Sequence, residues 1–313
     1  MKKVIAGIAL LVCPLVHAQD FPQRGPIEIT CLFPAGSSAD VTARVLAEGM
    51  SKHLGQRVLV VNRPGAGGAI GYKYVQAQKP DGYSLVWTSN SISTSHHSGQ
   101  LPFDYKSFDA VARALSESVV IAVRSDARWK TLKDLLADAK RQPKAVSVGH
   151  SGIGSHTHIS LVALTRAAGV EVNEVPFGAA QVVPSVVGGH VNAVVQFPGA
   201  LAAPMKQGQL RLLAALTQNR DPAWPDVPTA REQGFDAALD AWRGIAVPAG
   251  TPKNVIGMLE ESIRKTVQSA EFGKASANLG VRPAFLPAAQ FSELISKEDA
   301  SLSRLMQLIG LKK

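Results

Sequence analysis

Cysteine and aromatic residues are scarce in this sequence. Its 313 residues include two cysteines, Cys13 and Cys31, and only 6% are aromatic. Cys13 falls in a segment that we expect to be removed, so Cys31 has no partner for an intramolecular disulfide. Internal repeats and low-complexity tracts are also missing. Stability must therefore come from a hydrophobic core, and the chain is long enough for one large or two ordinary domains.

Long hydrophobic runs are equally few. The longest, residues 4–16, follows the basic pair Lys2-Lys3 and leads into Val16-His17-Ala18, which has small residues where a signal peptidase cleaves. Its 13 residues are too few to cross a bilayer, which takes about 20. We expect residues 1–18 to be a signal peptide cleaved after Ala18. The mature chain is then a soluble protein of the periplasm.

Acidic residues are outnumbered by basic ones, 24 to 33, which gives a formal charge of +9. Removal of Lys2 and Lys3 with the signal peptide lowers this charge to +7. The remaining basic residues are scattered, and the densest group is Lys140-Arg141 with Lys144. Scattered charge indicates a solvated surface, and no aromatic residues alternate with it, so nucleic acid is not an expected partner.

Short apolar runs alternate with helical patterns along most of the chain. Residues 27–33, 57–61 and 83–88 predict strands, and residues 40–54 predict a helix with Leu46, Met50 and Leu54 on one face. Residues 89–100 are polar without periodicity and predict a surface loop. Two long helices are expected near the C-terminus. The alternation predicts an α/β protein of mainly parallel sheets with helices on both faces.

The order of elements predicts two lobes. Lobe 1 is expected to comprise residues 19–120 and 226–313, and lobe 2 residues 121–225. The chain would cross from one lobe to the other near residue 120 and return between residues 220 and 245.

Two loops between a predicted strand and a predicted helix are rich in glycine and serine. They read Phe33-Pro34-Ala35-Gly36-Ser37-Ser38-Ala39-Asp40 and Gly149-His150-Ser151-Gly152-Ile153-Gly154-Ser155-His156. Each would place N–H groups and hydroxyls at the positive end of a helix dipole, which suits an anion. Neither contains Lys or Arg, which favours a carboxylate over a polyphosphate. The alternative is that both are ordinary connections with a serine as helix cap.

The second loop also resembles the nucleophile elbow of serine hydrolases, G-x-S-x-G, with Ser151 as nucleophile. Ile153 replaces the last glycine of that motif, and the acid and histidine that should follow the serine are missing in the required order. A hydrolase using Ser151 therefore stays an unfavoured alternative, and we expect no enzyme activity.

Cofactor and metal motifs are incomplete. The turn Gly65-Ala66-Gly67-Gly68 imitates a dinucleotide fingerprint, but Ile70 stands where the third glycine is needed. His96-His97 and the pair His156 and His158 have no Cys or carboxylate at ligand spacing. We expect neither a cofactor nor a metal ion.

Several segments together resemble one family. They are Phe33-Pro34-Ala35-Gly36 with Asp40, Asn62-Arg63-Pro64-Gly65-Ala66-Gly67-Gly68, Pro80-Asp81-Gly82-Tyr83, Gly154-Ser155 with His158, Val175-Pro176-Phe177-Gly178, and Pro248-Ala249-Gly250-Thr251-Pro252. The chain resembles the substrate-binding proteins of tripartite tricarboxylate transporters, the Bug-type receptors. The resemblance implies a periplasmic binding protein fold similar to type II, with two lobes that close like a hinge on a small carboxylate held in the cleft between them.

The resemblance also implies which residues bind the ligand. They lie in the first loop of each lobe and in a later turn: Phe33, Ala35, Gly36, Ser37 and Ser38 with Asp40 behind them; Ser151, Gly152, Gly154, Ser155 and His156; and Phe177, Gly178, Ala179 and Ala180. The expected ligand classes are an amino acid, a dicarboxylate or tricarboxylate, or an aromatic acid. Phe33, Phe177 and Phe197 favour the aromatic acid over the tricarboxylate.

The expected partners follow from the same resemblance. The receptor would act as a monomer and deliver its ligand to the membrane subunits of a tripartite transporter. A sequence of the same kind would also serve a ligand-sensing module that docks on a membrane sensor kinase.

Overall fold

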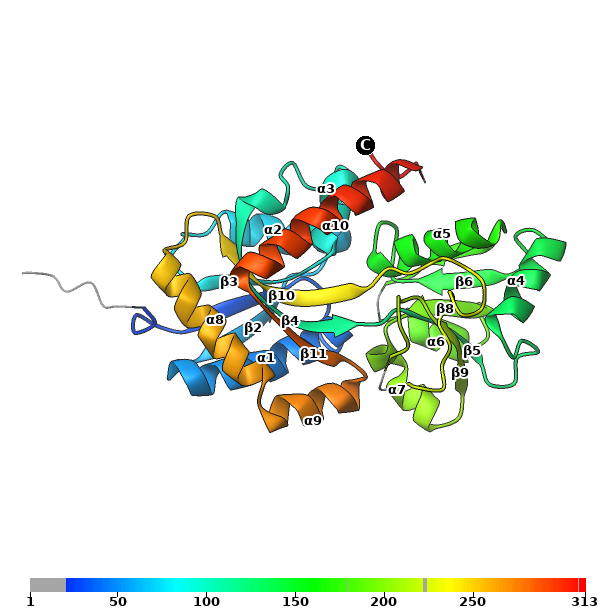
Figure 1. The fold of residues 1–313 in the computed structure, drawn as a ribbon, viewed down its shortest axis with the longest axis horizontal. Helices are drawn as coiled ribbons and strands as arrows, with labels where there is room; N and C mark the ends of the chain where they lie inside the picture. Colours follow the sequence, from blue (N-terminus) through cyan, green and yellow to red (C-terminus); the bar gives the residue numbers. More distant parts are fainter. Residues whose placement is uncertain (1–20, 179, 222–223, 309) are drawn as a thin grey trace, which may run out of the picture.

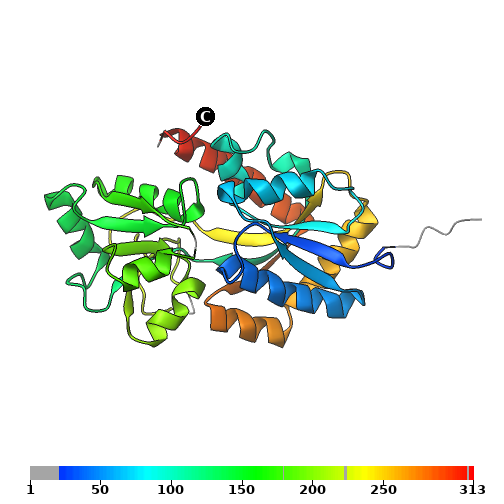
Figure 2. The same cartoon turned by 180° about the vertical axis from the view of Figure 1, so that it is seen from behind.

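Two α/β lobes lie side by side in the computed structural model, which describes residues 21–178, 180–221, 224–308 and 310–313 (Figures 1 and 2). The expected signal peptide, residues 1–18, lies outside the described residues. Within the described ranges, no helix combines the length and the apolar character needed to cross a membrane. The two-lobed α/β architecture predicted from the sequence is confirmed.

The first lobe is built on a six-stranded sheet in the order β11-β4-β10-β3-β1-β2. Its strands are β1 (Ile27–Cys31), β2 (Val58–Asn62), β3 (Ser84–Ser89), β4 (Phe108–Glu117), β10 (Ala241–Pro248) and β11 (Arg282–Pro287). Its helices are α1 (Ser38–Leu54), α2 (Ala69–Gln76), α3 (Ser91–His97), α8 (Lys253–Val267), α9 (Ala270–Leu279) and α10 (Ala288–Leu308). Leu46 and Met50 of α1 are fully buried against the sheet, as their spacing predicts, and α1 ends at Gly55 in the left-handed conformation.

The second lobe is built on a five-stranded sheet in the order β7-β6-β8-β5-β9. Its strands are β5 (Val120–Arg124), β6 (Ser147–His150), β7 (Asn173–Pro176), β8 (Ala193–Gln196) and β9 (Leu210–Ala215). Its helices are α4 (Leu132–Arg141), α5 (His156–Ala168), α6 (Val182–Val187) and α7 (Pro198–Lys206). Each lobe has its own apolar core, so each sheet is stabilised independently of the cleft between them.

Both sheets are mixed, which corrects the expectation of mainly parallel sheets. β1 is parallel to β2 and β3, but β10 is antiparallel to β3 and β4, and β11 is antiparallel to β4. In the second sheet β6 is parallel to β7 and β8, while β5 is antiparallel to β8 and β9. The antiparallel strands are chiefly those at which the chain passes from one lobe to the other and back. The passages between the lobes are not the βα units that the alternation suggested, so they do not require parallel strands.

The chain crosses between the lobes twice, at neighbouring places. β4 ends at Glu117 and β5 begins at Val120, while β10 begins at Ala241 beside the end of β4. Before the return, Ala230 pairs with Ala215 and contributes to the core of the second lobe. The second lobe thus continues past residue 225, where the sequence placed its end.

The segment expected to be a surface loop, residues 89–100, contains the helix α3, and most of that helix is buried. This helix has no apolar stripe, since most of its residues are small and polar. It can still be buried, because the hydroxyls of these residues form hydrogen bonds inside the protein. Ser91 Oγ, for example, lies 3.0 Å from Tyr72 Oη and accepts a hydrogen bond from Ser89 Oγ at 2.9 Å. The helix packs beneath α10, so its burial depends on residues about 200 positions away. The C-terminal region also differs from the expected two helices, since it has three helices and the strand β11.

The C-terminal helix contacts both lobes. Leu302 and Met306 of α10 form a buried apolar cluster with Ile159 of α5, and an Arg166 guanidinium N–H donates to the Leu308 carbonyl. Both views show the C-terminal end of α10 directed toward the second lobe (Figures 1 and 2). We call the contact of Ile159 with Leu302 and Met306 the α5–α10 cluster.

Candidate ligand-binding site

A cavity of about 260 Å³ lies between the lobes. The first lobe lines it with residues of the loop before α1, and the second lobe with residues of the loop before α5. The ends of the crossing strands complete it with Glu117 from β4 and Ala241, Trp242 and Arg243 from β10. One cavity is therefore built from both predicted loops and from the region where the chain passes between lobes.

Asp40 organises the loop before α1 and does not line the cavity. One of its carboxylate oxygens accepts the N–H of Gly36 at 2.9 Å, and the other accepts the Asn62 amide at 2.9 Å and pairs with Arg44 at 2.9 Å. Burial opposes its ionisation, but these hydrogen bonds outweigh burial and hold the pKa of Asp40 below its ordinary value. Since the N–H of Gly36 is committed to Asp40, it is not available to a ligand.

The loop before α5 is organised in the same way. Ser155 caps the helix by accepting the His158 N–H at 3.2 Å, and Gly154 donates its N–H to His158 Nδ1 at 3.0 Å. The Ser151 N–H is bonded to Thr157 Oγ1 at 3.0 Å. The backbone donors of this loop, like that of Gly36, thus largely serve the loop itself.

The first turns of α1 and α5 hold the donors that remain free. The N–H groups of Ser38 and Ala39 in α1, and of His156 and Thr157 in α5, have no acceptor among the described residues. All four residues line the cavity. Two helix N-termini, one from each lobe, therefore present unpaired donors to the same space, and each carries about half a positive charge.

His156 also ties α5 to the return crossing. Its Nε2–H donates to the Leu239 carbonyl at 3.0 Å, and its ring stacks on Phe197 with centroids 6.1 Å apart. Burial lowers the pKa of His156 to about 4, so the ring is neutral at physiological pH. It lines the cavity as a flat, uncharged wall.

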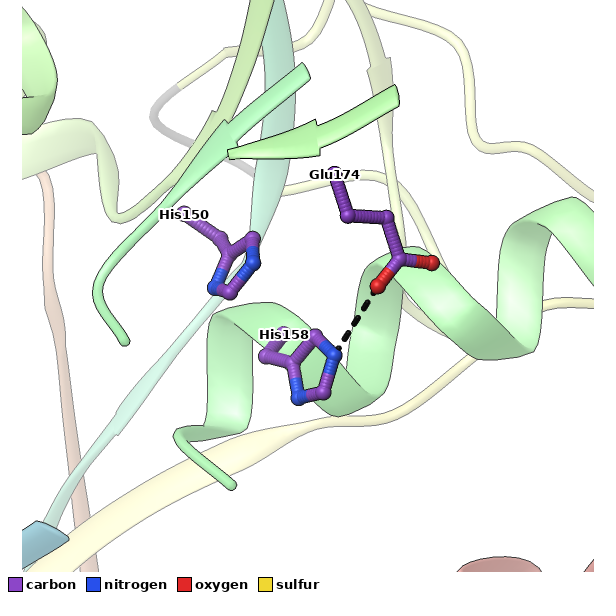
Figure 3. Close-up of side chains that lie close together, drawn as sticks. All are labelled: His150, His158 and Glu174. Atoms are coloured by element: carbon purple, nitrogen blue, oxygen red, sulfur yellow. Dashed lines mark hydrogen bonds and ion pairs between the residues drawn. The ribbon is translucent and has the colours of Figure 1, made fainter. Parts of the chain in front are cut away.

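His150, His158 and Glu174 come together behind the second loop (Figure 3). The two rings stack at 4.5 Å, and His158 Nε2 lies 3.0 Å from a Glu174 oxygen. The sequence analysis found no carboxylate near His158, because Glu174 is brought there from β7. The three side chains offer ligand atoms within 4.8 Å of one another, which is the spacing of a metal site.

The hydrogen bonds of this cluster favour a proton, and not a metal ion, on His158 Nε2. His158 Nδ1 accepts the Gly154 N–H, so the proton of the neutral ring lies on Nε2, between His158 and Glu174. A metal ion bound to Nε2 would move that proton to Nδ1, where it would face the Gly154 N–H. The cluster therefore holds the loop before α5 in place.

The stability of the protein is expected to fall between pH 7 and pH 5, partly through His150. Burial, followed by the nearby His158, lowers the pKa of His150 to about 4. The unfolded chain takes up a proton near pH 6.5 and the folded chain does not, so stability decreases as the pH falls through this window. Urea unfolding of His150→Gln should show about 2 kcal/mol less loss between pH 7 and pH 5 than the original chain.

The exposed His190 provides the control for this measurement. His190→Gln should leave the loss between pH 7 and pH 5 unchanged. An equal loss in the original chain and in His150→Gln would show that His150 titrates normally in the folded state.

Glu117 and Arg243 form a buried ion pair in the lining of the cavity. Arg243 Nε donates to a Glu117 oxygen at 2.6 Å, and the Ser38 hydroxyl donates to the other oxygen. The guanidinium lies 5.7 Å from the ring centroid of Phe33 and 5.4 Å from that of Phe197. The loops lack basic residues, as the sequence showed, but a cation reaches the cavity from β10.

Trp242 and Asn90, which also line the cavity, are held from behind by α10. Asn90 accepts the Trp242 backbone N–H at 3.2 Å, and its amide donates to Glu298 at 2.6 Å. The Trp242 indole N–H donates to the same Glu298 oxygen. Burial raises the pKa of Glu298 to about 7. The C-terminal helix thus fixes one wall of the cavity.

The structure brings most of the predicted site residues together. Those that line the cavity are Phe33, Ala35, Gly36, Ser37, Ser38, Ser151, Ser155, His156 and Ala180. Those that lie outside its lining are Asp40, Gly152, Gly154, Phe177 and Gly178. Ala179 lies outside the described residues. The ring of Phe177 packs against Gly149, and of the described residues of the turn, 177, 178 and 180, only Ala180 lines the cavity.

Several lining residues were missed by the sequence analysis. They include Gly67, Ser89, Asn90, Ser91, Glu117, Thr157, Val183, Gln196, Ala200, Trp242 and Arg243. A charged residue inside the apolar run 241–248 is the one signal that could have singled out Arg243. The polar run 89–91 gave no such signal, because it was interpreted as a loop.

Ser151 lacks the surroundings of a catalytic serine. Its hydroxyl accepts a hydrogen bond from the Gln196 amide at 3.1 Å. Among the described residues, no histidine side chain is hydrogen-bonded to it. This geometry gives no support to the hydrolase alternative.

Comparisons with known proteins agree on one family. A family model described as "Tripartite tricarboxylate transporter family receptor" matches residues 42–311. BugT of Bordetella pertussis is 30% identical over 323 residues, which cover 100% of this chain and 99% of BugT. A TctC solute binding protein from Polaromonas is 32% identical, with a TM-score of 0.74, over 92% of this chain and 99% of that one. MatC from Rhodopseudomonas palustris, solved with bound malate, is 25% identical with a TM-score of 0.81, over 91% and 99%.

Proposed function

The chain belongs to the tripartite tricarboxylate transporter receptor family, and from this premise we propose that it is a periplasmic receptor that binds a small carboxylate between its lobes. One observation carries the proposal. The free N–H groups in the first turns of α1 and α5 come from different lobes and open on one cavity. A carboxylate has two oxygens and can accept hydrogen bonds from both helix ends at once.

The charge of the site fits a single carboxylate. Two helix N-termini together supply about one positive charge, and the Glu117–Arg243 pair is neutral as a unit. A ligand that bridges the two helix ends stabilises the closed arrangement through its contacts with both lobes. The malate bound to the related MatC supports a carboxylate as the ligand class.

For the partner we propose the membrane subunits of a tripartite transporter, because the family model carries the name of that transporter. A sensor kinase, the alternative that the sequence left open, would bind the same ligand-loaded form. Co-purification from solubilised host membranes, with and without ligand, distinguishes the two. We further propose that residues 1–18 direct export and that the receptor acts as a monomer, since both lobes of one chain contribute residues to the cavity lining.

Ser38→Pro is expected to weaken carboxylate binding by roughly 10- to 100-fold, because it removes one charge-assisted hydrogen bond from the site. Ser38 is the first residue of α1, where proline is well tolerated in a helix, so the substitution removes the N–H without disrupting the fold. Titration calorimetry measures the change. The ligand is whichever acid most raises the melting temperature in a screen of small carboxylates that includes malate.

Ser38→Ala is the matched control, because it removes the hydroxyl that bonds to Glu117 and keeps the backbone N–H. It should bind the acid more tightly than Ser38→Pro. Equal affinities of the two variants would place the carboxylate elsewhere in the cavity. A screen in which no small carboxylate raises the melting temperature would contradict the receptor function, because a ligand at 100 times its Kd adds about 2.7 kcal/mol of stability.

A further inference from the structure

Arg243 has N–H donors that no group in the described part of the chain accepts. Its Nε is bonded to Glu117, but neither terminal nitrogen has an acceptor among the described residues. Arg243 lines the cavity, and its terminal nitrogens are not among the polar atoms that the protein encloses without a partner. They therefore open on the cavity. A guanidinium offers five N–H donors in a planar fork, so four remain after the bond to Glu117.

Glu117 is fully committed within the site. One of its oxygens accepts from Arg243 and the other from the Ser38 hydroxyl. The carboxylate is almost completely buried, at 1% exposed. It cancels the charge of Arg243 but leaves the outward N–H donors free. The Glu117–Arg243 pair is thus a part of the lining that donates hydrogen bonds without net charge.

The walls around Arg243 are apolar. The ring centroids of Phe33 from the first lobe and Phe197 from the second lie 5.7 and 5.4 Å from the guanidinium, and Val183, Ala200 and Trp242 also line the cavity. Apolar walls of this kind favour a hydrocarbon segment in the ligand. It would connect the carboxylate at the helix ends to a second group at Arg243.

We propose that Arg243 determines specificity by donating to an uncharged oxygen of the ligand, so that the preferred ligand is a monocarboxylate with a hydroxyl or carbonyl at its other end. This inference rests on the carboxylate-receptor function proposed above. A second carboxylate at Arg243 would leave about one uncompensated negative charge next to the buried carboxylate of Glu117. An apolar end would leave the donors of Arg243 without partners once water is excluded.

The test compares three kinds of acid at each of three chain lengths, four to six carbons. The plain acid ends in a methyl group, the hydroxy acid ends in a hydroxyl, and the diacid ends in a second carboxylate. Titration calorimetry on the unaltered protein should show, at the best chain length, at least tenfold tighter binding of the hydroxy acid than of the other two. This part of the test needs no variant.

The double variant Glu117→Gln with Arg243→Met removes both charges and leaves no unpaired ion in the interior. Its affinity ratio between hydroxy acid and plain acid should fall to nearly one. Arg113→Met is the matched control. Arg113 lies on the adjacent strand β4 and bonds to the Ala284 carbonyl, away from the cavity lining, so its variant should keep the original ratio.

Two results would overturn the role of Arg243. One is a hydroxy acid preference that persists in the double variant. The other is tighter binding of the diacid in the unaltered protein, which would show that Arg243 accepts a second carboxylate. If none of the nine acids binds, the ligand is not of the class inferred here, and the receptor function is decided by the broader carboxylate screen described above.

Discussion

Glu117→Ala is expected to lower the free energy of unfolding by about 3–5 kcal/mol, the usual cost of leaving one partner of a buried ion pair without the other. Arg243 is only 4% exposed, and the two side chains are 2.6 Å apart. Without the carboxylate, the guanidinium stays charged in the protein interior. Urea unfolding at pH 7 without ligand measures the loss.

The double variant Glu117→Gln with Arg243→Met separates the cost of an unpaired charge from the cost of altered packing. It should recover most of the stability lost in Glu117→Ala, because buried ion pairs are often close to neutral when both charges are replaced. A loss below about 1 kcal/mol in the single variant would match an exposed pair, and would mean that the crossing strands are solvated.

Phe291→Ala is expected to lower the free energy of unfolding by about 3–5 kcal/mol, because removal of the ring leaves a cavity in the core. Phe291 is fully buried on α10, and its ring meets Trp242 edge to face with centroids 4.9 Å apart. It also packs on Gly244 of β10, where a Cβ would come within 2.6 Å of the ring. The ring therefore packs directly against the backbone of β10 at Gly244, where no side chain intervenes.

Phe103 is a suitable control for this substitution, since it is only partly buried at the edge of another cluster. Phe103→Ala should cost clearly less than Phe291→Ala in the same urea unfolding measurement. Equal losses would contradict the view that α10 is anchored through Phe291. The Phe291 variant should also bind carboxylate more weakly, because Trp242 loses the packing that supports its wall of the cavity.

Local sequence patterns predicted the parts of the fold that depend on local chemistry. The spacing of Leu46 and Met50 identified the buried face of α1, and the family resemblance is confirmed by the match over residues 42–311. The two glycine- and serine-rich loops both contribute residues to the cavity lining. The spacing within α1, the motifs behind the resemblance and each of these loops are short segments that can be identified without their distant partners.

Features that depend on distant partners could not be predicted in the same way. Residues 89–97 have the polar composition of a surface loop. In the structure their polar groups bond to Tyr72 and to α10 and not to water, and the sequence does not show these distant partners. Glu117 and Arg243 are 126 positions apart, and only the pairing of β4 with β10 brings them together. The sequence also could not show that the N–H groups of Gly36 and Gly154 donate hydrogen bonds to Asp40 and His158.

The α5–α10 cluster has a consequence for how affinity should be measured. Ile159 belongs to one lobe, while Leu302 and Met306 belong to the last helix of the other, so the two lobes adhere through this contact, which lies outside the lining of the cavity. The adhesion contributes to the observed dissociation constant of every ligand, although no ligand touches it. An affinity tag placed after Lys313 would be attached next to the hydrogen bond from the Lys313 N–H to the His97 carbonyl, which joins the segment after α10 to α3. Binding constants are therefore best compared on a chain tagged elsewhere or not at all.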